Sequence, residues 1–241
     1  MPNSLSENLL RRFVTAVLVA VLPAVVAVSN ASGEPIALST PAGLNPGDSF
    51  RFLFVTQGQT TAESVDIGTY HTFVQSQASG ATYNGLTVNW KAIGSTFTVA
   101  ARDNVGGFNT LVPVYLPNGT QLALNLTTGT GGLWSASLLA APNGGIDGST
   151  VSGDVWTGST SSGGSGGSSG ALGHSEFPLL GLSSSTSGWL SFSDSTLIDN
   201  LRPMYGLSET LTAVPEPTTY AMALAGLACG GYSMWRRRKR A

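Results

Sequence analysis

SFRFLFVT, residues 49–56, is the stretch that decides the fold class of this chain of 241 residues. Apolar residues alternate with other residues, and β-branched and aromatic side chains are frequent, which is typical of a β-strand. The pattern predicts the first clear strand of the chain. Shorter stretches of the same kind predict further strands over residues 87–93, 96–100, 113–116, 121–126, 188–192 and 202–211.

One connection between these strands carries a strong turn signal. Asn118-Gly119 separates residues 113–116 from residues 121–126. Both residues tolerate a positive φ angle, and Asn-Gly between alternating runs is typical of a tight β-hairpin. We therefore expect an antiparallel hairpin at this point.

Residues 64–78 change to helical spacing. Their apolar and larger side chains recur every three or four residues, at Ile67, Tyr70, Phe73, Val74 and Gln77. Thr60, Thr61 and Ser64 are available as capping residues. The expected fold class is therefore mainly β (α+β), a single β-rich domain with one amphipathic helix.

Residues 158–170 consist only of Gly, Ser and one Thr. This composition has nothing to bury and predicts a flexible surface loop. A linker between two domains is the alternative, but residues 171–213 are too few for an independent core. We therefore expect one domain over residues 32–213 that contains this Gly/Ser tract.

The N-terminal residues 1–31 have the three parts of a secretory signal peptide. Arg11 and Arg12 precede an apolar stretch, residues 13–28, and small residues follow at the cleavage position. We expect signal peptidase to cut between Ala31 and Ser32, so that the domain is exported across the inner membrane. An uncleaved N-terminal anchor is the alternative.

The C-terminal residues 214–241 also have three parts. Val214-Pro215-Glu216-Pro217 has an extended backbone, because proline fixes φ and has no N–H to donate. Residues 218–235 carry no charge and are about long enough to cross a bilayer as a transmembrane helix. A basic segment within residues 236–241 then stops transfer and stays in the cytoplasm; it contains Arg236, Arg237, Arg238, Lys239 and Arg240.

This three-part tail resembles the PEP-CTERM sorting signal of Gram-negative bacteria. The resemblance covers residues 214–241 and implies processing by an exosortase, an integral-membrane cysteine protease. It also implies a transient anchor in the inner membrane, followed by transfer to the cell surface or the extracellular matrix. Signal peptidase and exosortase are therefore the expected processing partners.

The domain between the two ends is poor in cations. Residues 32–213 hold 4 basic residues and 11 of the 13 acidic ones, which is a net charge of −7. Such a surface cannot neutralise a row of phosphates, so nucleic acid is excluded as a partner. The single cysteine, Cys229, lies in the apolar segment 218–235 and leaves the domain without a disulfide or a cysteine metal site.

A second resemblance runs through the domain itself. Its residues occur in order within 54–56, 66–74, 90–93, 101–104, 155–158 and 205–208. The series resembles a recurring domain of PEP-CTERM proteins, which is itself similar to C-type-lectin-like or endostatin-like folds. The chain lacks the paired cysteines and the Glu-Pro-Asn or Gln-Pro-Asp motifs that accompany calcium-dependent sugar binding in the lectins.

Residue types suited to catalysis are few. His71 and His174 are the only histidines, and no Gly-x-Ser-x-Gly elbow between a strand and a helix accompanies them. We interpret both as solvated polar residues. Asp103 with Glu63 or Asp66 would be a carboxylate pair for glycoside hydrolysis, but an ion pair between Arg102 and Asp103 that anchors a loop is the simpler interpretation.

Two glycine-rich turns, residues 143–148 and 152–154, offer oxygen ligands for calcium. Turn formation explains their Asn-Gly and Asp-Gly pairs without an ion. The sequence therefore predicts no metal, no cofactor and no catalytic residue, and the protein is not expected to be an enzyme.

Five tryptophans are the remaining candidates for a binding role. Trp235 is expected to anchor the tail at the membrane edge, and the others lie in or beside strand patterns, where core packing is usual. A platform for stacking a sugar would need Trp134 or Trp156 to be exposed.

These observations predict an exported, exosortase-sorted protein of the cell surface or extracellular matrix. Its expected role is non-catalytic, structural or adhesive, and associated with exopolysaccharide and biofilm. A carbohydrate-binding lectin-like module is the alternative, with an unrecognised polysaccharide hydrolase behind it. Polysaccharide is thus the expected partner of the domain, in addition to the membrane that holds the tail.

Overall fold

The strand predicted over residues 49–56 is β2 (Ser49–Val55), which lies in the middle of the main sheet. The computed structural model describes residues 35–135, 137–193 and 196–214, together with residues 224, 225 and 227. All of them belong to one unit, residues 34–241.

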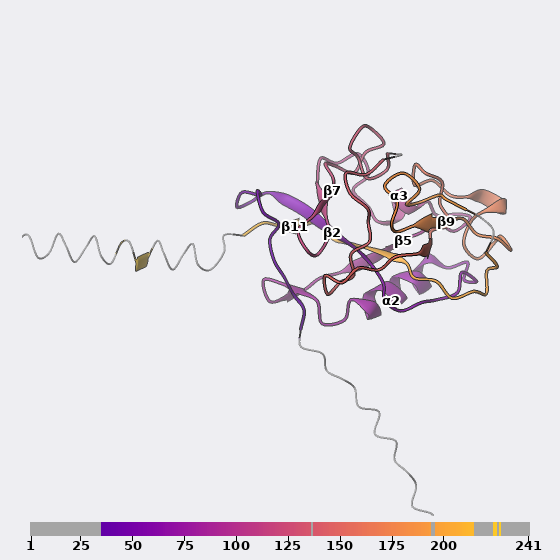
Figure 1. The fold of residues 1–241 in the computed structure, drawn as a ribbon, viewed down its shortest axis with the longest axis horizontal. Coiled ribbons are helices and arrows are strands. Elements are labelled where there is room, and N and C mark those ends of the chain that lie inside the picture. The colour runs from indigo at the N-terminus through magenta and orange to yellow at the C-terminus, as the bar shows by residue number, and fades with distance from the viewer. Residues whose placement is uncertain (1–34, 136, 194–195, 215–223, 226, 228–241) are drawn as a thin grey trace, which may run out of the picture. The chain divides into compact units, whose positions relative to one another are not determined.

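Five further strands complete the main sheet. Figure 1 labels β5, β7 and β11 of these, together with β2. The order is β5-β10-β2-β6-β7, and β11 also pairs with β2. β2 is antiparallel to β10 and β11 and parallel to β6. The bounds are β5 (Trp90–Ile93), β6 (Val114–Tyr115), β7 (Gln121–Ala123), β10 (Tyr205–Ser208) and β11 (Leu211–Thr212).

Both faces of β2 are covered. Phe50, Phe52 and Phe54 belong to one hydrophobic core, and Leu53 and Val55 belong to the other. All five side chains are 0% exposed. Successive residues of a strand point to opposite faces, so a single strand contributes to the two cores on either side of the sheet. Each such side chain stabilises the fold by about 1.5–3 kcal/mol.

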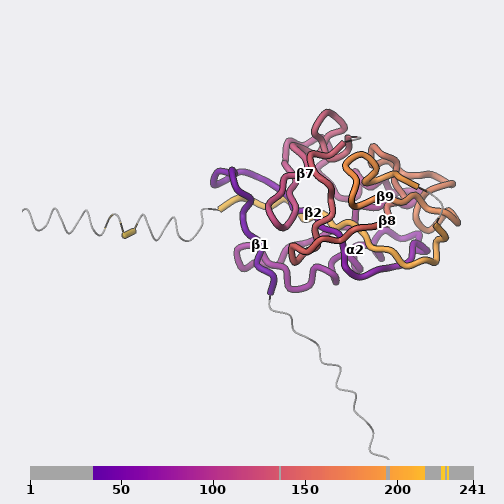
Figure 2. The backbone as a smooth tube through the Cα atoms, in the orientation of Figure 1, coloured from indigo at the N-terminus to yellow at the C-terminus, as the bar shows by residue number. Residues whose placement is uncertain are grey.

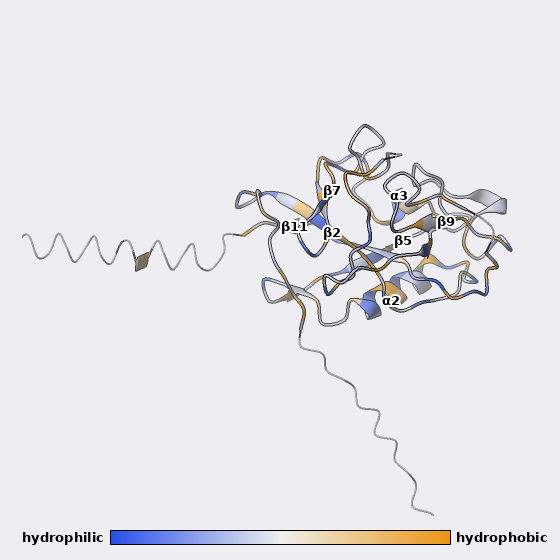
Figure 3. Ribbon diagram, in the orientation of Figure 1, coloured by the Kyte–Doolittle hydropathy of each residue, from blue (hydrophilic) through white to orange (hydrophobic). Residues whose placement is uncertain are grey.

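The helix α2 (Ile67–Gln77) covers the first of these faces, where Tyr70 and Val74 are buried. Figure 3 shows both hydrophobic and hydrophilic residues along it, as expected of a helix with one face in the core. The capping residue is Asp66, whose carboxylate accepts a hydrogen bond from the Gly68 N–H at 2.9 Å. The expectation that Thr60, Thr61 or Ser64 caps the helix was therefore wrong.

The close approach of α2 to the sheet depends on Gly206 in β10. A Cβ added at Gly206 would contact the Phe54 ring and lie 2.6 Å from Val74 Cγ1. Real Cβ atoms essentially never have contacts under 3.0 Å. The absent side chain lets the helix pack onto the strand.

The hairpin predicted at Asn118-Gly119 is confirmed. β6 and β7 are antiparallel, and the Leu116 N–H donates to the Thr120 carbonyl at 2.8 Å. Of the two turn residues Asn118 and Gly119, only Gly119 has a positive φ angle, 87°. Asn118 instead accepts the Thr120 N–H on its side-chain oxygen.

Two small ladders flank the main sheet, one of β1, β3 and β4 and one of β8 and β9. Figure 2 shows β1 and the β8–β9 ladder at opposite ends of this unit. These strands contain only two or three residues each: β1 (Ala37–Leu38), β3 (Thr82–Tyr83), β4 (Leu86–Thr87), β8 (Asp154–Trp156) and β9 (Leu180–Leu182).

Several strand predictions need correction. Residues 87–93 are divided between β4 and β5, and residues 202–211 between β10 and β11. Residues 96–100 form one isolated bridge, from Thr96 to Leu172, before the short helix α3 (Ala101–Asn104). Residues 188–192 also form no strand. Local alternation was present in residues 96–100 and 188–192, but these two segments have no partner strand in register. The mainly β fold class is nevertheless confirmed.

The Gly/Ser tract, residues 158–170, differs from the flexible surface loop that its composition predicts. Thr160 and Gly164 are hydrogen-bonded backbone to backbone, as are Gly158 and Gly166. The tract also contains the 3-10 helix η1 (Gly167–Ser169). Ser159 is 0% exposed, so the expectation that the tract buries nothing was wrong.

Glycine and serine have separate physical roles in this tract. Gly163 has φ 74° and packs against the Trp134 ring, where a Cβ would collide. The Ser159 hydroxyl hydrogen-bonds the Ser95 hydroxyl at 2.8 Å, and the Ser165 hydroxyl donates to the Thr96 carbonyl at 2.8 Å. Small residues thus allow close backbone contact, and hydroxyls satisfy buried polar groups.

Replacing Gly206 by alanine should destabilise the fold, because the new methyl group overlaps α2 and Phe54. Overpacking of this kind costs about 1–3 kcal/mol. The measurement is the free energy of unfolding in urea. Gly129→Ala is the matched control, since its nearest atom lies 3.4 Å from the added Cβ. Equal stability of Gly206→Ala and Gly129→Ala would contradict this close packing of α2 on β10.

The Gly/Ser tract should resist a broad-specificity protease until the domain unfolds, because its backbone is hydrogen-bonded. Gly163→Ala should make residues 158–170 cleavable, since the methyl group displaces the tract from Trp134. Limited proteolysis with mapping of the fragments measures this. Ser161→Ala, at an exposed position in the same tract, should behave like the wild type. Rapid cleavage of the wild-type tract would show that it is a mobile loop.

Candidate functional site

The junction between the folded domain and the predicted sorting tail lies at the end of β11. Leu211 and Thr212 pair with Phe50 and Ser49 of β2. The Ala213 N–H donates to the Asp48 carbonyl, and the Ala213 carbonyl accepts from the Gly47 N–H, both at 2.8 Å. Val214 follows and is 38% exposed. The domain is thus hydrogen-bonded up to the residue before Val214, with no spacer.

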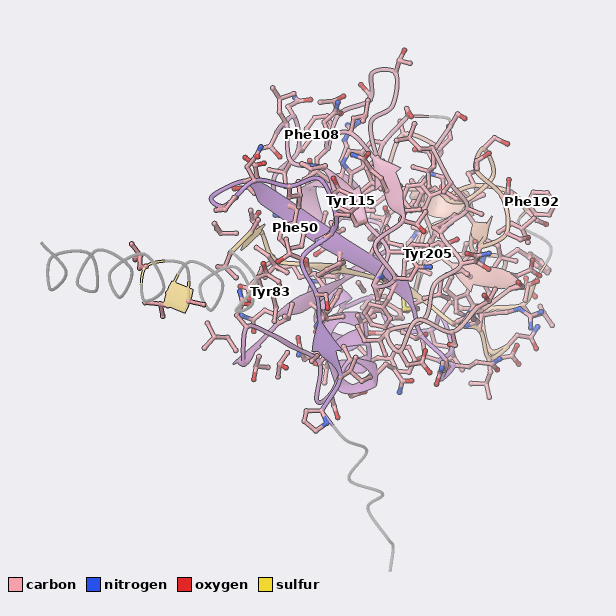
Figure 4. The ribbon with its side chains drawn as sticks, turned by 60° about the vertical axis from the view of Figure 1, so that its left-hand side comes forward. Phe50, Tyr83, Phe108, Tyr115, Phe192 and Tyr205 are labelled. Atoms are coloured by element: carbon pink, nitrogen blue, oxygen red, sulfur yellow. The ribbon has the colours of Figure 1, made fainter. Side chains whose placement is uncertain are left out.

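Tyr83 holds this end of the chain in place. Its hydroxyl donates to the Thr212 carbonyl at 3.1 Å and shares a hydrogen bond with the Thr40 hydroxyl at 2.8 Å. Its ring packs edge-on against Phe50, 5.4 Å between centroids, and Tyr115 packs against Phe50 in the same way (Figure 4). β11 is therefore connected to the hydrophobic core through Tyr83, in addition to its pairing with β2.

A shallow, mostly apolar hollow of about 310 Å³ lies beside the junction. Its lining includes Tyr83, Leu86, Leu211 and Val214, and one acid, Glu209. Leu86 is 73% exposed. The domain surface next to Val214 is thus mostly apolar, although the rest of the chain is rich in serine.

Most of the predicted processing residues lie outside the described residues. This applies to Ala31 and Ser32 at the signal cleavage position and to Pro215, Glu216 and Pro217 of the motif. It applies equally to the basic residues 236–240 and to most of the segment 218–235. Of the helices within the described part of the chain, none is long and apolar enough to span a membrane.

The tryptophans in the part of the chain that the structure describes do not form an exposed sugar platform. Trp134 and Trp156, the two candidates, are 1% and 0% exposed. The Trp156 indole N–H donates to the Thr60 and Asn200 carbonyls, and the Trp134 ring stacks near Trp189 at 6.3 Å. The prediction of core packing is confirmed for Trp90, Trp134, Trp156 and Trp189; Trp235 lies outside the described residues.

Within the described residues, three phenylalanines are exposed aromatic residues that sequence reasoning missed. Phe97, Phe177 and Phe192 are 53%, 40% and 60% exposed. Phe97 stacks on His174, with 4.6 Å between ring centroids, and Phe192 lies at the edge of the domain in Figure 4. Local sequence patterns carry no signal for these positions, because exposure depends on what the rest of the chain covers.

His71 is not a solvated residue, which corrects the prediction. Its Nδ1 accepts the Ala92 N–H at 3.0 Å, and its Nε2 lies 2.8 Å from Asn104 Oδ1. Since Nδ1 accepts, the neutral ring carries its proton on Nε2 and donates to Asn104. Burial lowers the pKa of His71; the Asn104 hydrogen bond opposes this shift and the Lys91 charge adds to it. His71 therefore joins α2, β5 and α3 and has no free nitrogen.

The other candidate side chains are also explained by local structure. Arg102 lies over the Phe108 ring, 5.0 Å from its centroid, and within the described chain no ion pair joins it to Asp103. The Asp147 carboxylate accepts the Ser149 N–H and the Gln57 amide, both at 2.9 Å, and hydrogen bonds from Ser149 chiefly lower its pKa. Among the described residues no three His, Cys, Asp or Glu side chains gather as for a metal ion.

One part of the chain, its C-terminal segment, matches a known family model. Residues 213–239 match the PEP-CTERM protein-sorting motif. No curated protein matches the chain. The match begins at Ala213. This residue is hydrogen-bonded to Gly47 and Asp48, which directly precede β2. The chain is thus a PEP-CTERM domain-containing protein that is exported and sorted by an exosortase.

The stability of the domain should fall on acidification through His71. The folded state holds His71 with a lowered pKa, so the unfolded state takes up the proton first as the pH falls below about 6.5. The contribution of His71 is complete above that pH and is lost below it. His71→Gln should flatten the change in unfolding free energy between about pH 7 and pH 5.

The control for this measurement is His174→Gln. His174 is exposed and takes no part in the hydrogen bonds between α2, β5 and α3. The pH profile of urea unfolding for His174→Gln is the reference with which the profile of His71→Gln is compared. An unaltered profile for His71→Gln would show that the ring does not titrate with folding.

Proposed function

We propose that this exosortase-sorted protein has a non-catalytic, structural or adhesive role at the cell surface or in the extracellular matrix, among exopolysaccharide and biofilm. The observation that carries the proposal is the junction at Ala213, where the last β-ladder hydrogen bonds end and the sorting motif begins. A domain that is complete up to this point can be displayed intact once the tail has been processed.

The proposed order of processing follows from the two ends of the chain. Signal peptidase cuts between Ala31 and Ser32, and residues 218–235 then hold the substrate in the inner membrane. The basic residues 236–240 keep that helix in place, since a cation at the bilayer centre costs about 2.5–3.5 kcal/mol on insertion scales. Exosortase then acts at the motif, residues 214–217.

The short tether supports processing close to the membrane. Residues 214–217 reach at most about 14 Å when fully extended, at roughly 3.3–3.6 Å per residue. The folded domain must therefore lie near the bilayer surface while residues 218–235 are inserted. Processing would change the protein from a membrane-held form to a released one without unfolding β11.

A non-catalytic role is favoured by the contacts that the two histidine rings make. Both ring nitrogens of His71 are used by Ala92 and Asn104. His174 stacks on Phe97 in an exposed position. A serine hydrolase needs a histidine whose nitrogen is available to a serine, with an acid behind it.

A carbohydrate-binding, lectin-like module is the second candidate. It is favoured by a polar groove that Asp154 and Arg202 line, because these two charged side chains lack full partners among the described residues. The likeness to C-type-lectin-like folds remains a prediction from the sequence, and calcium-dependent sugar binding is not part of the proposal.

Replacing Pro215-Glu216-Pro217 by three alanines should leave membrane insertion intact, because no apolar residue of 218–235 is lost. The variant should accumulate as an uncleaved membrane form, detected by fractionation and mass spectrometry. Deleting residues 214–241 should instead release the domain into the periplasm. If the triple-alanine variant matured and reached the surface at the normal level, the tail would be a plain anchor.

A further inference from the structure

We infer that a polar groove on the domain binds a neutral saccharide. The groove has a volume of about 340 Å³, near the lower end of the range for small-molecule sites. Its lining includes Gln57, Gln59, Ser152, Asp154, Arg202 and Pro203. The inference gives the carbohydrate-binding candidate a definite site and rests on it, but it is independent of sorting.

The walls of the groove are fixed by backbone hydrogen bonds. Thr60 and Arg202 exchange N–H donors and carbonyl acceptors, at 2.9 and 3.0 Å. The Trp156 N–H donates to the Pro203 carbonyl at 2.9 Å, and Asp154 begins β8. The Gln57 amide donates to Asp147 and Ser149. The site is therefore formed before any ligand arrives.

Two charged side chains in this groove lack full partners. Arg202 Nε is buried without a hydrogen-bond acceptor in the described part of the chain. The guanidinium makes a single long bond, from Nη1 to the Leu201 carbonyl at 3.4 Å. Asp154 accepts no side-chain hydrogen bond from any described residue, and the two charges form no ion pair there. Buried polar groups are usually satisfied, so an unpaired donor on a residue that lines a groove points to an outside acceptor.

The chemistry of the lining selects the ligand. A carboxylate only accepts hydrogen bonds, a guanidinium only donates them, and the Gln59 amide does both. Hydroxyl groups donate and accept, so neighbouring hydroxyls on a sugar ring can satisfy Asp154 and Arg202 together. Pro203 and Val151 provide apolar surface for the C–H groups of the ring.

The charge of the domain selects against an acidic ligand. Residues 32–213 carry a net charge of −7, and a ligand carboxylate bound to Arg202 would share the groove with Asp154. Like charges in one site disfavour each other. The expected ligand is therefore a neutral sugar.

The test is isothermal titration calorimetry on the full-length chain, in a detergent without a sugar headgroup. The probes are cellohexaose, laminarihexaose and maltohexaose, with hexagalacturonate and glycine as an acidic and a zwitterionic comparison. We expect a neutral probe to bind. Asp154→Asn and Gln59→Ala should each weaken that binding by roughly tenfold or more, because each removes hydrogen bonds to the ligand. Arg102→Gln, outside the groove, is the control and should bind like the wild type.

Arg202→Gln belongs to the same series, and thermal unfolding shows whether it remains folded. If Arg202→Gln does not fold, Asp154→Asn and Gln59→Ala test the site by themselves. Neither Asp154 nor Gln59 is buried, so both variants should fold. If both variants still bind a neutral probe like the wild type, the groove is not the binding site. The domain would then bind carbohydrate at another place. No binding of any neutral probe, or binding of hexagalacturonate or glycine alone, would overturn both the site and the ligand class. None of these results depends on maturation of the tail.

Discussion

The burial of β2 on both faces is the constraint on which the rest of the structure depends. Phe50, Phe52 and Phe54 require a cover on one side of the sheet, and Leu53 and Val55 require one on the other. A strand with two apolar faces is stable only inside a layered fold. α2 meets the first requirement, and the segments around Trp134 and Trp189 meet the second.

One polar side chain interrupts this strand and shows how completely it is enclosed. Arg51 is 7% exposed. Its guanidinium donates to the Val105 and Gly106 carbonyls and to the Thr210 hydroxyl, all at 3.1 Å. Burial lowers the pKa of Arg51, and the Glu209 charge opposes the shift. A buried charge is tolerated when hydrogen bonds replace its water, so Arg51 links β2 to α3's C-terminal loop and to the β10–β11 turn.

The same strand connects the hydrophobic cores to the sorting motif and to the polar groove. β11 pairs with the first residues of β2, and the sorting motif begins at Ala213, directly after β11. Thr56, just after β2, lines the polar groove at its other end. The domain has no disulfide to hold these ends. Close packing at Gly163 and Gly206 and buried serine hydroxyls perform that stabilising role instead.

The sequence by itself determined the features that depend on neighbours in the chain. Alternation identified β2, Asn118-Gly119 identified the hairpin, helical spacing identified α2, and the residues from Val214 onward identified the sorting tail. Tertiary structure alone decided the features that join distant residues. The polar groove brings Gln59 together with Asp154 and Arg202, and the Gly/Ser tract packs against Trp134 and is hydrogen-bonded to Ser95. Composition describes what a segment can bury by itself, whereas order and exposure depend on which remote surfaces pack against it.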